Sequence, residues 1–147
     1  MAPDFADLTQ LAEPAAPSRG RSLRVLLVED NAVNQIYGEA VLQQMGHSAA
    51  IASDGQQAVR MASAERYDII LMDCQMPVQD GYEATRLIRR RELERGEPRR
   101  RIVALTASAM ADDHRACLEA GMDQVLVKPF SVEAMAELLE LQGHAAA

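Results

Sequence analysis

The stretch Tyr67-Asp68-Ile69-Ile70-Leu71-Met72-Asp73-Cys74-Gln75-Met76-Pro77 decides how the rest of the chain is organised. Its apolar run from Ile69 to Met72 is too short for a helix and is typical of a strand buried on both faces of a parallel sheet. The run ends in Asp73, and Pro77 stops regular structure soon afterwards. Functional groups in open α/β sheets gather beyond the carboxyl ends of the strands. From this stretch alone, Asp73 is either a reactive carboxylate or a helix-capping residue.

Length and composition narrow the class of protein. The chain has 147 residues, of which 48% are hydrophobic, so we expect one domain with a full core. Its net charge of −7 argues against a general nucleic-acid binder, and no apolar stretch approaches the roughly 18 residues that cross a bilayer. Cys74 and Cys117 lack metal-site spacing and indicate a reduced protein. We therefore expect a cytoplasmic protein that makes no membrane contact and binds no nucleic acid.

Alternation of short apolar runs with helical periodicity predicts the fold class. Residues 1–21 contain Pro3, Pro14 and Pro17 and are typical of a flexible linker, in which a short helix over Phe5–Leu11 is allowed. Strands are predicted over 23–28, 47–52, 69–73, 102–105 and 125–127. Helices are predicted over 31–46 with their caps, 56–66, 82–94, 109–120 and 131–141. Right-handed crossovers between such strands give a doubly wound, five-stranded parallel α/β sheet with five helices.

Three local patterns have a structural and a functional interpretation. In the first predicted helix, apolar residues fall at helical spacing: Val33, Ile36, Tyr37, Ala40, Val41 and Met45. In the last predicted helix we expect four residues to face inward: Val132, Met135, Leu138 and Leu139. His47 follows a helix end, and we interpret it as a solvated residue rather than a ligand. Residues 86–101 contain eight arginines and three glutamates. We interpret this run as a solvated helix end and loop rather than a basic docking patch.

Four of the five predicted strands end in chemically capable groups, namely Glu29-Asp30, Asp73, Thr106 and Lys128. Because strand ends in such a sheet lie side by side, we expect these groups to share one pocket. Three clustered carboxylates need a counter-charge, and hard oxygen ligands suit Mg²⁺. Lys128 is the only lysine in the chain, and Thr106 offers a small hydroxyl donor. A carboxylate nucleophile together with a divalent cation, an ammonium and a hydroxyl donor predicts phosphoryl transfer to Asp73.

These groups occur in sequence blocks that resemble a known family. The blocks are Val28-Glu29-Asp30-Asn31, Met72 to Pro77 with Asp80-Gly81, Ala104-Leu105-Thr106-Ala107 and Lys128-Pro129-Phe130. In this order they resemble the receiver domain of two-component response regulators, over residues 22–142, with residues 143–147 as a tail. The motifs Glu-Asp-Asn-Ala-Val-Asn-Gln and Met-Asp-Cys-Gln-Met-Pro further resemble those of receivers in hybrid sensor histidine kinases. The resemblance implies the flavodoxin-like receiver fold with strand order 2-1-3-4-5.

The resemblance also implies roles at a metal site. Asp73 would be the phosphoacceptor, and Asp30 and Asp73 would ligate Mg²⁺ directly. Glu29 would act through a bound water, and the backbone carbonyl of Gln75 would complete the protein ligands.

Further implied roles concern the phosphoryl group. Thr106 and Lys128 would contact it, and the Lys128–Pro129 bond would be cis. Many receivers carry Tyr or Phe three residues before this lysine, but here the position is Val125. The usual aromatic readout is therefore in doubt for this chain, and we interpret Phe130 as core packing.

The resemblance implies partners as well. The phosphoryl donor would be a phosphohistidine of a sensor histidine kinase or of a histidine phosphotransfer domain, docking near Val33, Asn34 and Tyr37. The product would be an aspartyl phosphate on a signalling domain that assists its own phosphorylation and dephosphorylation, rather than on a metabolic enzyme. We expect a monomer or weak dimer. Because only residues 142–147 follow, we expect a stand-alone receiver or, as the motif wording favours, the receiver of a hybrid kinase.

Other classes of function fit the sequence less well. A haloacid-dehalogenase-type phosphohydrolase needs a second Asp two residues after the nucleophile, where this chain has Gln75, and a cap domain. A pseudo-receiver that only binds partners would have lost one of Glu29, Asp30, Asp73 or Lys128. A flavin carrier would need a Ser/Thr-rich loop after the first strand, which is lacking here.

Overall fold

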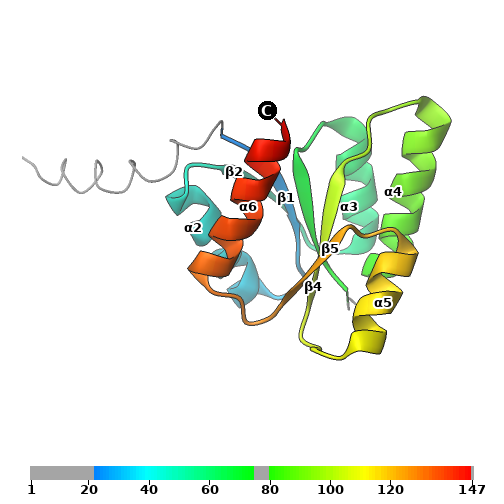
Figure 1. The fold of residues 1–147 in the computed structure, drawn as a ribbon. Helices are drawn as coiled ribbons and strands as arrows, with labels where there is room; N and C mark the ends of the chain where they lie inside the picture. Colours follow the sequence, from blue (N-terminus) through cyan, green and yellow to red (C-terminus); the bar gives the residue numbers. More distant parts are fainter. Residues whose placement is uncertain (1–21, 75–79, 147) are drawn as a thin grey trace, which may run out of the picture.

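The computed structural model describes residues 22–74 and 80–146, with side chains described as far as residue 140. Strands and helices alternate along these residues (Figure 1). The strands are β1 (Arg24–Val28), β2 (Ser48–Ala52), β3 (Ile69–Asp73), β4 (Arg101–Thr106) and β5 (Gln124–Val127). The helices are α2 (Ala32–Gln44), α3 (Gly55–Ala64), α4 (Gly81–Arg95), α5 (Ala111–Ala120) and α6 (Val132–Ala146). The predicted linker over 1–21, the short helix over Phe5–Leu11 and Gln75 lie outside the described residues.

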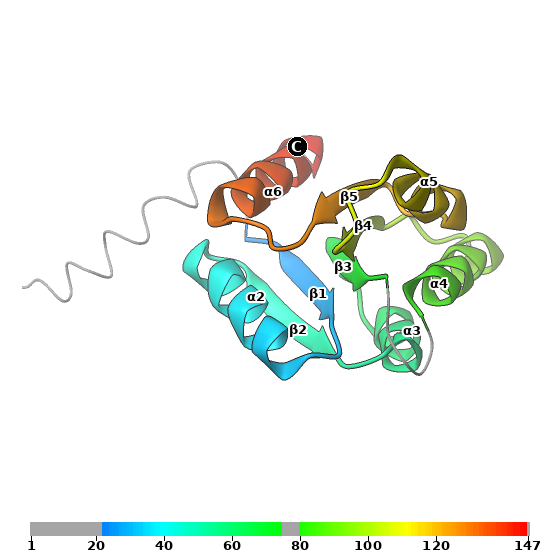
Figure 2. The same cartoon turned by 90° about the horizontal axis from the view of Figure 1, so that it is seen from below.

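All strand pairs are parallel, in the order β2-β1-β3-β4-β5. Helices α2 and α6 cover one face of the sheet, and α3, α4 and α5 cover the other (Figure 2). This confirms the predicted doubly wound α/β class and its strand order. The order reverses between β1 and β3, and ligands in such sheets bind beyond the strand ends at a reversal of this kind.

Alternation of side chains along each strand builds two cores. In β1, Leu26 and Val28 face α3 and α4, whereas Val25 and Leu27 face α2 and α6. Every residue of β3 is buried, as the apolar run predicts for a central strand. Asp73 ends this strand, so the packing of both faces fixes the position of its backbone.

Polar and glycine residues set the helix ends as predicted. The side chain of Asn31 accepts a hydrogen bond from the Asn34 N–H at 3.0 Å, and Ser131 Oγ accepts one from the Ala134 N–H at 3.0 Å. Gly121 ends α5 with a φ of 115°, a conformation that costs glycine little. Helix α6 continues to Ala146 rather than ending near Leu141, since nothing between them breaks a helix as proline does.

The predicted apolar spacing in α2 is divided between the two sides of the helix: Val41 is buried and Met45 packs against the core, but the apolar residues of the first turns are exposed. Val33 is 71% exposed and Ile36 68% exposed, whereas Gly38, Val41 and Leu42 are buried. At Gly38 the helix backbone comes so close to the sheet that an added Cβ would lie 2.7 Å from Leu27 Cδ2. The close approach at a glycine therefore decides which face packs, and Val33 and Ile36 are left in solvent. In α6, Val132 is likewise exposed instead of facing inward.

His47 is half-buried rather than solvated. Its Nδ1 accepts a hydrogen bond from the Leu23 N–H at 3.0 Å, which joins the start of β2 to the start of β1. Burial lowers the pKa of His47 because the imidazolium loses hydration, and the nearby charge of Asp68 opposes this only in part. The neutral ring is therefore part of the folded structure.

Part of the arginine-rich run forms a buried ion cluster instead of a solvated end. Glu92 is 4% exposed and accepts hydrogen bonds from Arg89 Nη1 at 2.9 Å and from the Arg100 backbone N–H at 2.9 Å. Arg89 and Arg99 each also donate to Asp123 at 2.8 Å. A buried carboxylate requires such partners, and here they connect α4, the start of β4 and the turn before β5.

Candidate functional site

The strand ends open into a pocket of about 250 Å³ at the carboxyl edge of the sheet. It is lined by Glu29, Asp30, Asn31, Asn34, Asp73, Thr106, Ala107 and Lys128. The structure therefore brings together every predicted site residue except Gln75, which lies outside the described residues. The strand register explains the convergence, because Val28 pairs with Met72, Asp73 with Leu105 and Thr106 with Val127.

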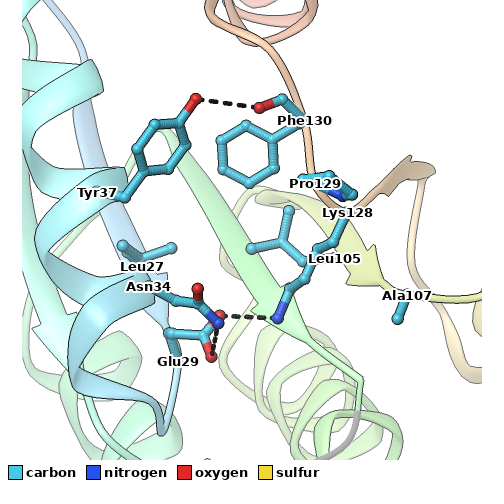
Figure 3. Close-up of a pocket in the computed structure, with 9 residues that line it drawn as sticks. All are labelled: Leu27, Glu29, Asn34, Tyr37, Leu105, Ala107, Lys128, Pro129 and Phe130. Atoms are coloured by element: carbon cyan, nitrogen blue, oxygen red, sulfur yellow. Dashed lines mark hydrogen bonds and ion pairs between the residues drawn. The ribbon is translucent and has the colours of Figure 1, made fainter.

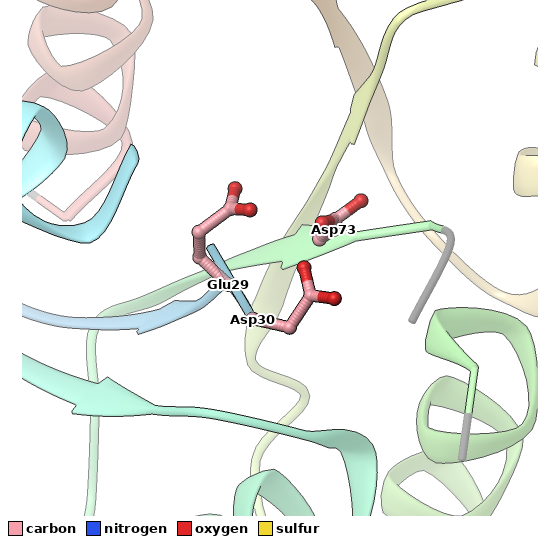
Figure 4. Close-up of side chains that lie close together, drawn as sticks. All are labelled: Glu29, Asp30 and Asp73. Atoms are coloured by element: carbon pink, nitrogen blue, oxygen red, sulfur yellow. The ribbon is translucent and has the colours of Figure 1, made fainter. Parts of the chain in front are cut away.

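Three carboxylates of the pocket lining lie close together (Figure 4). One oxygen from each of Glu29, Asp30 and Asp73 lies within 4.8 Å of the others. Glu29 and Asp73 are buried and Asp30 is exposed, so the cluster can be reached from solvent. Like charges at this spacing repel one another, and a set of hard oxygen donors fits a divalent cation of the Mg²⁺ kind.

Lys128 supplies the positive charge of the pocket. Its Nζ lies 2.9 Å from Glu29 Oε1 and 3.4 Å from Asp73 Oδ2. Burial by itself would lower the pKa of Lys128, but the hydrogen bond to Glu29 and the charges of Asp73 and Glu29 leave that pKa above its ordinary value. The Lys128–Pro129 peptide bond is cis, as expected.

The start of α2 orients Glu29. The Asn34 side-chain amide donates to Glu29 Oε2 at 3.3 Å, and the Asn31 N–H donates to the same oxygen at 3.4 Å. Gln35 Nε2 donates to the Glu29 carbonyl at 2.6 Å, a contact that the sequence did not predict. The only signal for Gln35 was its place at the end of the block Glu-Asp-Asn-Ala-Val-Asn-Gln.

The hydroxyl of Thr106 is held by the loop before α5. Thr106 Oγ1 accepts a hydrogen bond from the Ser108 N–H at 3.1 Å. Ser108 is in turn held by α5, since its carbonyl oxygen lies 2.8 Å from His114 Nε2 and its hydroxyl donates to Asp113 at 2.5 Å. Val125, at the place where many receivers have an aromatic ring, is half-buried and pairs with Ala104.

The backbone around Asp73 packs closely against β4 and the start of α4. The Cys74 N–H donates to the Leu105 carbonyl at 3.1 Å, which extends the pairing of β3 with β4. A Cβ on Gly81 would lie 2.3 Å from the Asp73 carbonyl oxygen, so only glycine fits there. The thiols of Cys74 and Cys117 are free and buried, with their sulfurs 3.4 Å apart. Burial, with hydrogen bonding to Cys117, raises the pKa of the Cys74 thiol and keeps it protonated.

The fold and the pocket together define a flavodoxin-like α/β domain whose strand ends carry an acidic pocket that could bind a divalent cation. Comparison with known proteins gives the family: the sequence profile of the response regulator receiver domain matches residues 25–140. The chain belongs to this family and is a receiver domain of two-component phosphorelay signalling.

Individual relatives agree with this assignment. The chain is 47% identical to the receiver domain of sensor histidine kinase PA1611 from Pseudomonas aeruginosa, solved with magnesium in its active-site cleft; the TM-score is 0.76, with 84% of this chain and 99% of that one covered. It is 34% identical to a chain in the co-crystal structure of the Saccharomyces cerevisiae histidine phosphotransfer protein Ypd1 with the receiver domain of Ssk1. The TM-score there is 0.82, over 86% of this chain and 92% of that one.

Among full-length proteins, the chain is 41% identical to sensor protein GacS of Pseudomonas syringae over 128 residues. That match covers 87% of this chain but 14% of GacS, so the chain corresponds to a small part of such a kinase. Within the described residues, no helix is both long and apolar enough to span a membrane.

Proposed function

We propose that this receiver domain accepts a phosphoryl group from a phosphohistidine onto Asp73, with Mg²⁺ bound in the acidic pocket. The observation that carries the proposal is the convergence of three carboxylates, a lysine and a threonine at one pocket. Asp73 is the carboxylate at the end of the central strand, and it lies within reach of Lys128 and of the carboxylates of Glu29 and Asp30.

We propose the metal ligands that the resemblance to receiver domains implies. Asp30 and Asp73 would bind Mg²⁺ directly, Glu29 would do so through water, and the carbonyl of Gln75 would add a further oxygen. When bound, Mg²⁺ supplies positive charge that offsets the carboxylates and the incoming phosphoryl oxygens. The magnesium-bound receiver of sensor histidine kinase PA1611, at 47% identity, supports this proposal.

The transfer itself is a displacement at phosphorus. A carboxylate oxygen of Asp73 forms the new O–P bond while the N–P bond of the phosphohistidine breaks, and the electron pair returns to the imidazole. Lys128 Nζ, which lies 3.4 Å from the Asp73 carboxylate in the resting pocket, leaves its carboxylate partners and pairs with a phosphoryl oxygen. Thr106 turns its hydroxyl from Ser108 toward another phosphoryl oxygen.

The outcome is a signal rather than a metabolic product. Water can later attack the aspartyl phosphate, so the same residues assist both gain and loss of the group. The phosphorylated form would shift the population between two conformations, with a coupling free energy of about 1–3 kcal/mol. We propose no separate enzymatic activity for the domain.

We propose a histidine phosphotransfer domain or the kinase itself as the partner, docking on the exposed face of α2. Val33 and Ile36 present apolar surface there, next to Asn34 and Tyr37 at the pocket rim. The Ypd1–Ssk1 complex and the kinase relatives support a partner of this kind. The kinase relatives also support a place within a hybrid histidine kinase, and the free thiols of Cys74 and Cys117 support the cytoplasm as its location.

Intact-protein mass after incubation with acetyl phosphate tests the proposal. The wild type is expected to gain one phosphoryl group with Mg²⁺ and none with chelator. Asp73→Asn should gain none, while Asp112→Asn, the same change at an exposed position of α5, should behave as wild type. Uptake by Asp73→Asn at the wild-type rate would place the acceptor elsewhere, and no uptake by the wild type from acetyl phosphate or from a phosphorylated phosphotransfer domain would refute the function.

A further inference from the structure

A second pocket, of about 310 Å³, lies between α2 and the segment that follows β5 (Figure 3). Its lining is mainly apolar, and it consists of Leu27, Glu29, Asn34, Tyr37, Leu105, Ala107, Lys128, Pro129 and Phe130. Glu29, Asn34 and Lys128 belong to both pockets, so this space adjoins the site of phosphoryl transfer.

Two polar contacts span this second pocket, one at each end (Figure 3). At the lower end, Lys128 Nζ donates to Glu29 at 2.9 Å. At the upper end, the Tyr37 hydroxyl donates to the Phe130 carbonyl oxygen at 3.1 Å, and the two rings lie 5.6 Å apart at 45°. Phe130 packs against the core on the α2 and α6 side of the sheet, whereas the space between these two ends is open. The Tyr37 hydroxyl therefore supplies a polar contact from α2 to this segment at the far end of the pocket from Lys128 Nζ.

We propose that Tyr37 is a positioning residue for phosphoryl transfer, because it anchors the Lys128–Phe130 segment and so holds the ammonium of Lys128 over the pocket. This inference rests on the proposed function. A lysine side chain is long and flexible, so the place of its ammonium depends on a well-held backbone. The Lys128 backbone N–H donates to the Thr106 carbonyl at 2.7 Å, and the Tyr37 hydroxyl supplies a second contact two residues further along, at the Phe130 carbonyl.

The same tyrosine also lies on the outer face of α2. Its side chain is partly exposed beside Val33 and Ile36, on the face that we propose for the phosphohistidine-bearing partner. A partner seated there contacts the residue that holds Lys128 in place. Docking and the position of the catalytic ammonium are thereby connected through one side chain.

Acylation of Lys128 tests the anchoring without any phosphoryl transfer. Lys128 is the only lysine in the chain, so an amine-acylating ester at fixed pH reacts with Lys128 and the terminal amine alone, and peptide mass spectrometry separates the two. Tyr37→Phe keeps the ring and removes the hydroxyl. It should acylate at Lys128 about two- to tenfold faster than wild type, relative to the terminal amine, as expected for loss of one hydrogen bond.

Tyr82→Phe is the matched control, since it removes a phenolic hydroxyl from α4, on the other face of the sheet. Its acylation rate should equal that of wild type. If Tyr37→Phe also acylates at the wild-type rate, Tyr37 does not hold Lys128 and the proposal is overturned.

A double-mutant cycle on phosphorylation by acetyl phosphate tests the link to the reaction. At saturating Mg²⁺, Tyr37→Phe should slow phosphorylation about two- to tenfold in the wild-type background and not at all in the Lys128→Ala background. An equal slowing in both backgrounds would show that Tyr37 acts independently of Lys128. If the wild type takes up no phosphoryl group, the proposed function fails, while the acylation result still decides the anchoring.

Discussion

Replacing Lys128 with methionine should destabilise the metal-free protein and increase the stabilisation that Mg²⁺ provides. The ammonium is the counter-charge of a buried carboxylate, Glu29, and lies close to a second one, Asp73. Methionine keeps the length of the side chain and removes the charge. Both carboxylates then remain in the pocket without their neighbouring cation.

The contacts of Glu29 set the size of the effect. Removing one partner of a buried ion pair costs about 3–5 kcal/mol. The Lys128 side chain is 21% exposed and Glu29 keeps its donors from Asn31 and Asn34, so we expect a lower cost of about 2–3 kcal/mol. At about 2–4 °C of Tm for each kcal/mol, the metal-free variant should melt about 4–12 °C below wild type.

Mg²⁺ should raise the Tm of Lys128→Met by more than it raises the Tm of the wild type. In the wild type, the cation must compete with Lys128 for Glu29 and Asp73, whereas Lys128→Met removes this competition. Because a ligand stabilises the folded state according to its affinity, tighter binding gives the variant the larger gain in Tm on adding Mg²⁺.

Scanning calorimetry in chelator and in Mg²⁺ measures both effects. Arg115→Met is the control, since it removes one positive charge from an exposed pair with Asp112 that is worth at most about 1 kcal/mol. The reasoning is refuted if Lys128→Met and Arg115→Met have the same Tm in chelator. It is also refuted if Mg²⁺ raises the Tm of Lys128→Met by no more than it raises the Tm of the wild type.

Three further changes test other parts of the structure. Glu92→Ala should lower the free energy of unfolding by about 2–4 kcal/mol in urea titrations because it leaves the half-buried Arg89 and Arg100 without their carboxylate, whereas the exposed Glu94→Ala should change it by less than about 0.5 kcal/mol. Gly81→Ala should slow phosphorylation by on the order of tenfold or more, because its Cβ must displace the Asp73 carbonyl; Gly38→Ala, which meets only the far end of a leucine side chain, should leave the rate near wild type. Folding lowers the pKa of His47, so the contribution of the neutral ring to stability is complete above its ordinary pKa of 6.5 and is lost as the pH falls below that value. The urea midpoint of the wild type should therefore decrease below this pH by a contribution that His47→Gln lacks.

The strands and the chemistry at their ends could be predicted because both are local properties of the sequence. A central strand such as Ile69–Asp73 needs an unbroken apolar run, and a parallel sheet places all its strand ends at one edge. The convergence of Glu29, Asp73, Thr106 and Lys128 therefore follows from strand positions alone. Helix caps such as Asn31 were predictable for the same reason, since a cap contacts its own first turn.

Contacts between distant segments were decided only by the tertiary structure. Apolar spacing in α2 could not show that Gly38 would turn to the sheet and leave Val33 in solvent, because burial depends on how closely two elements approach. The partner of His47 is 24 residues away in the chain, and that of Tyr37 is 93 residues away. By itself the sequence determined the fold class and which residues meet at the strand ends. Which polar groups are buried and paired, and which apolar ones stay exposed, depends on free-energy terms that arise only when separate elements pack together.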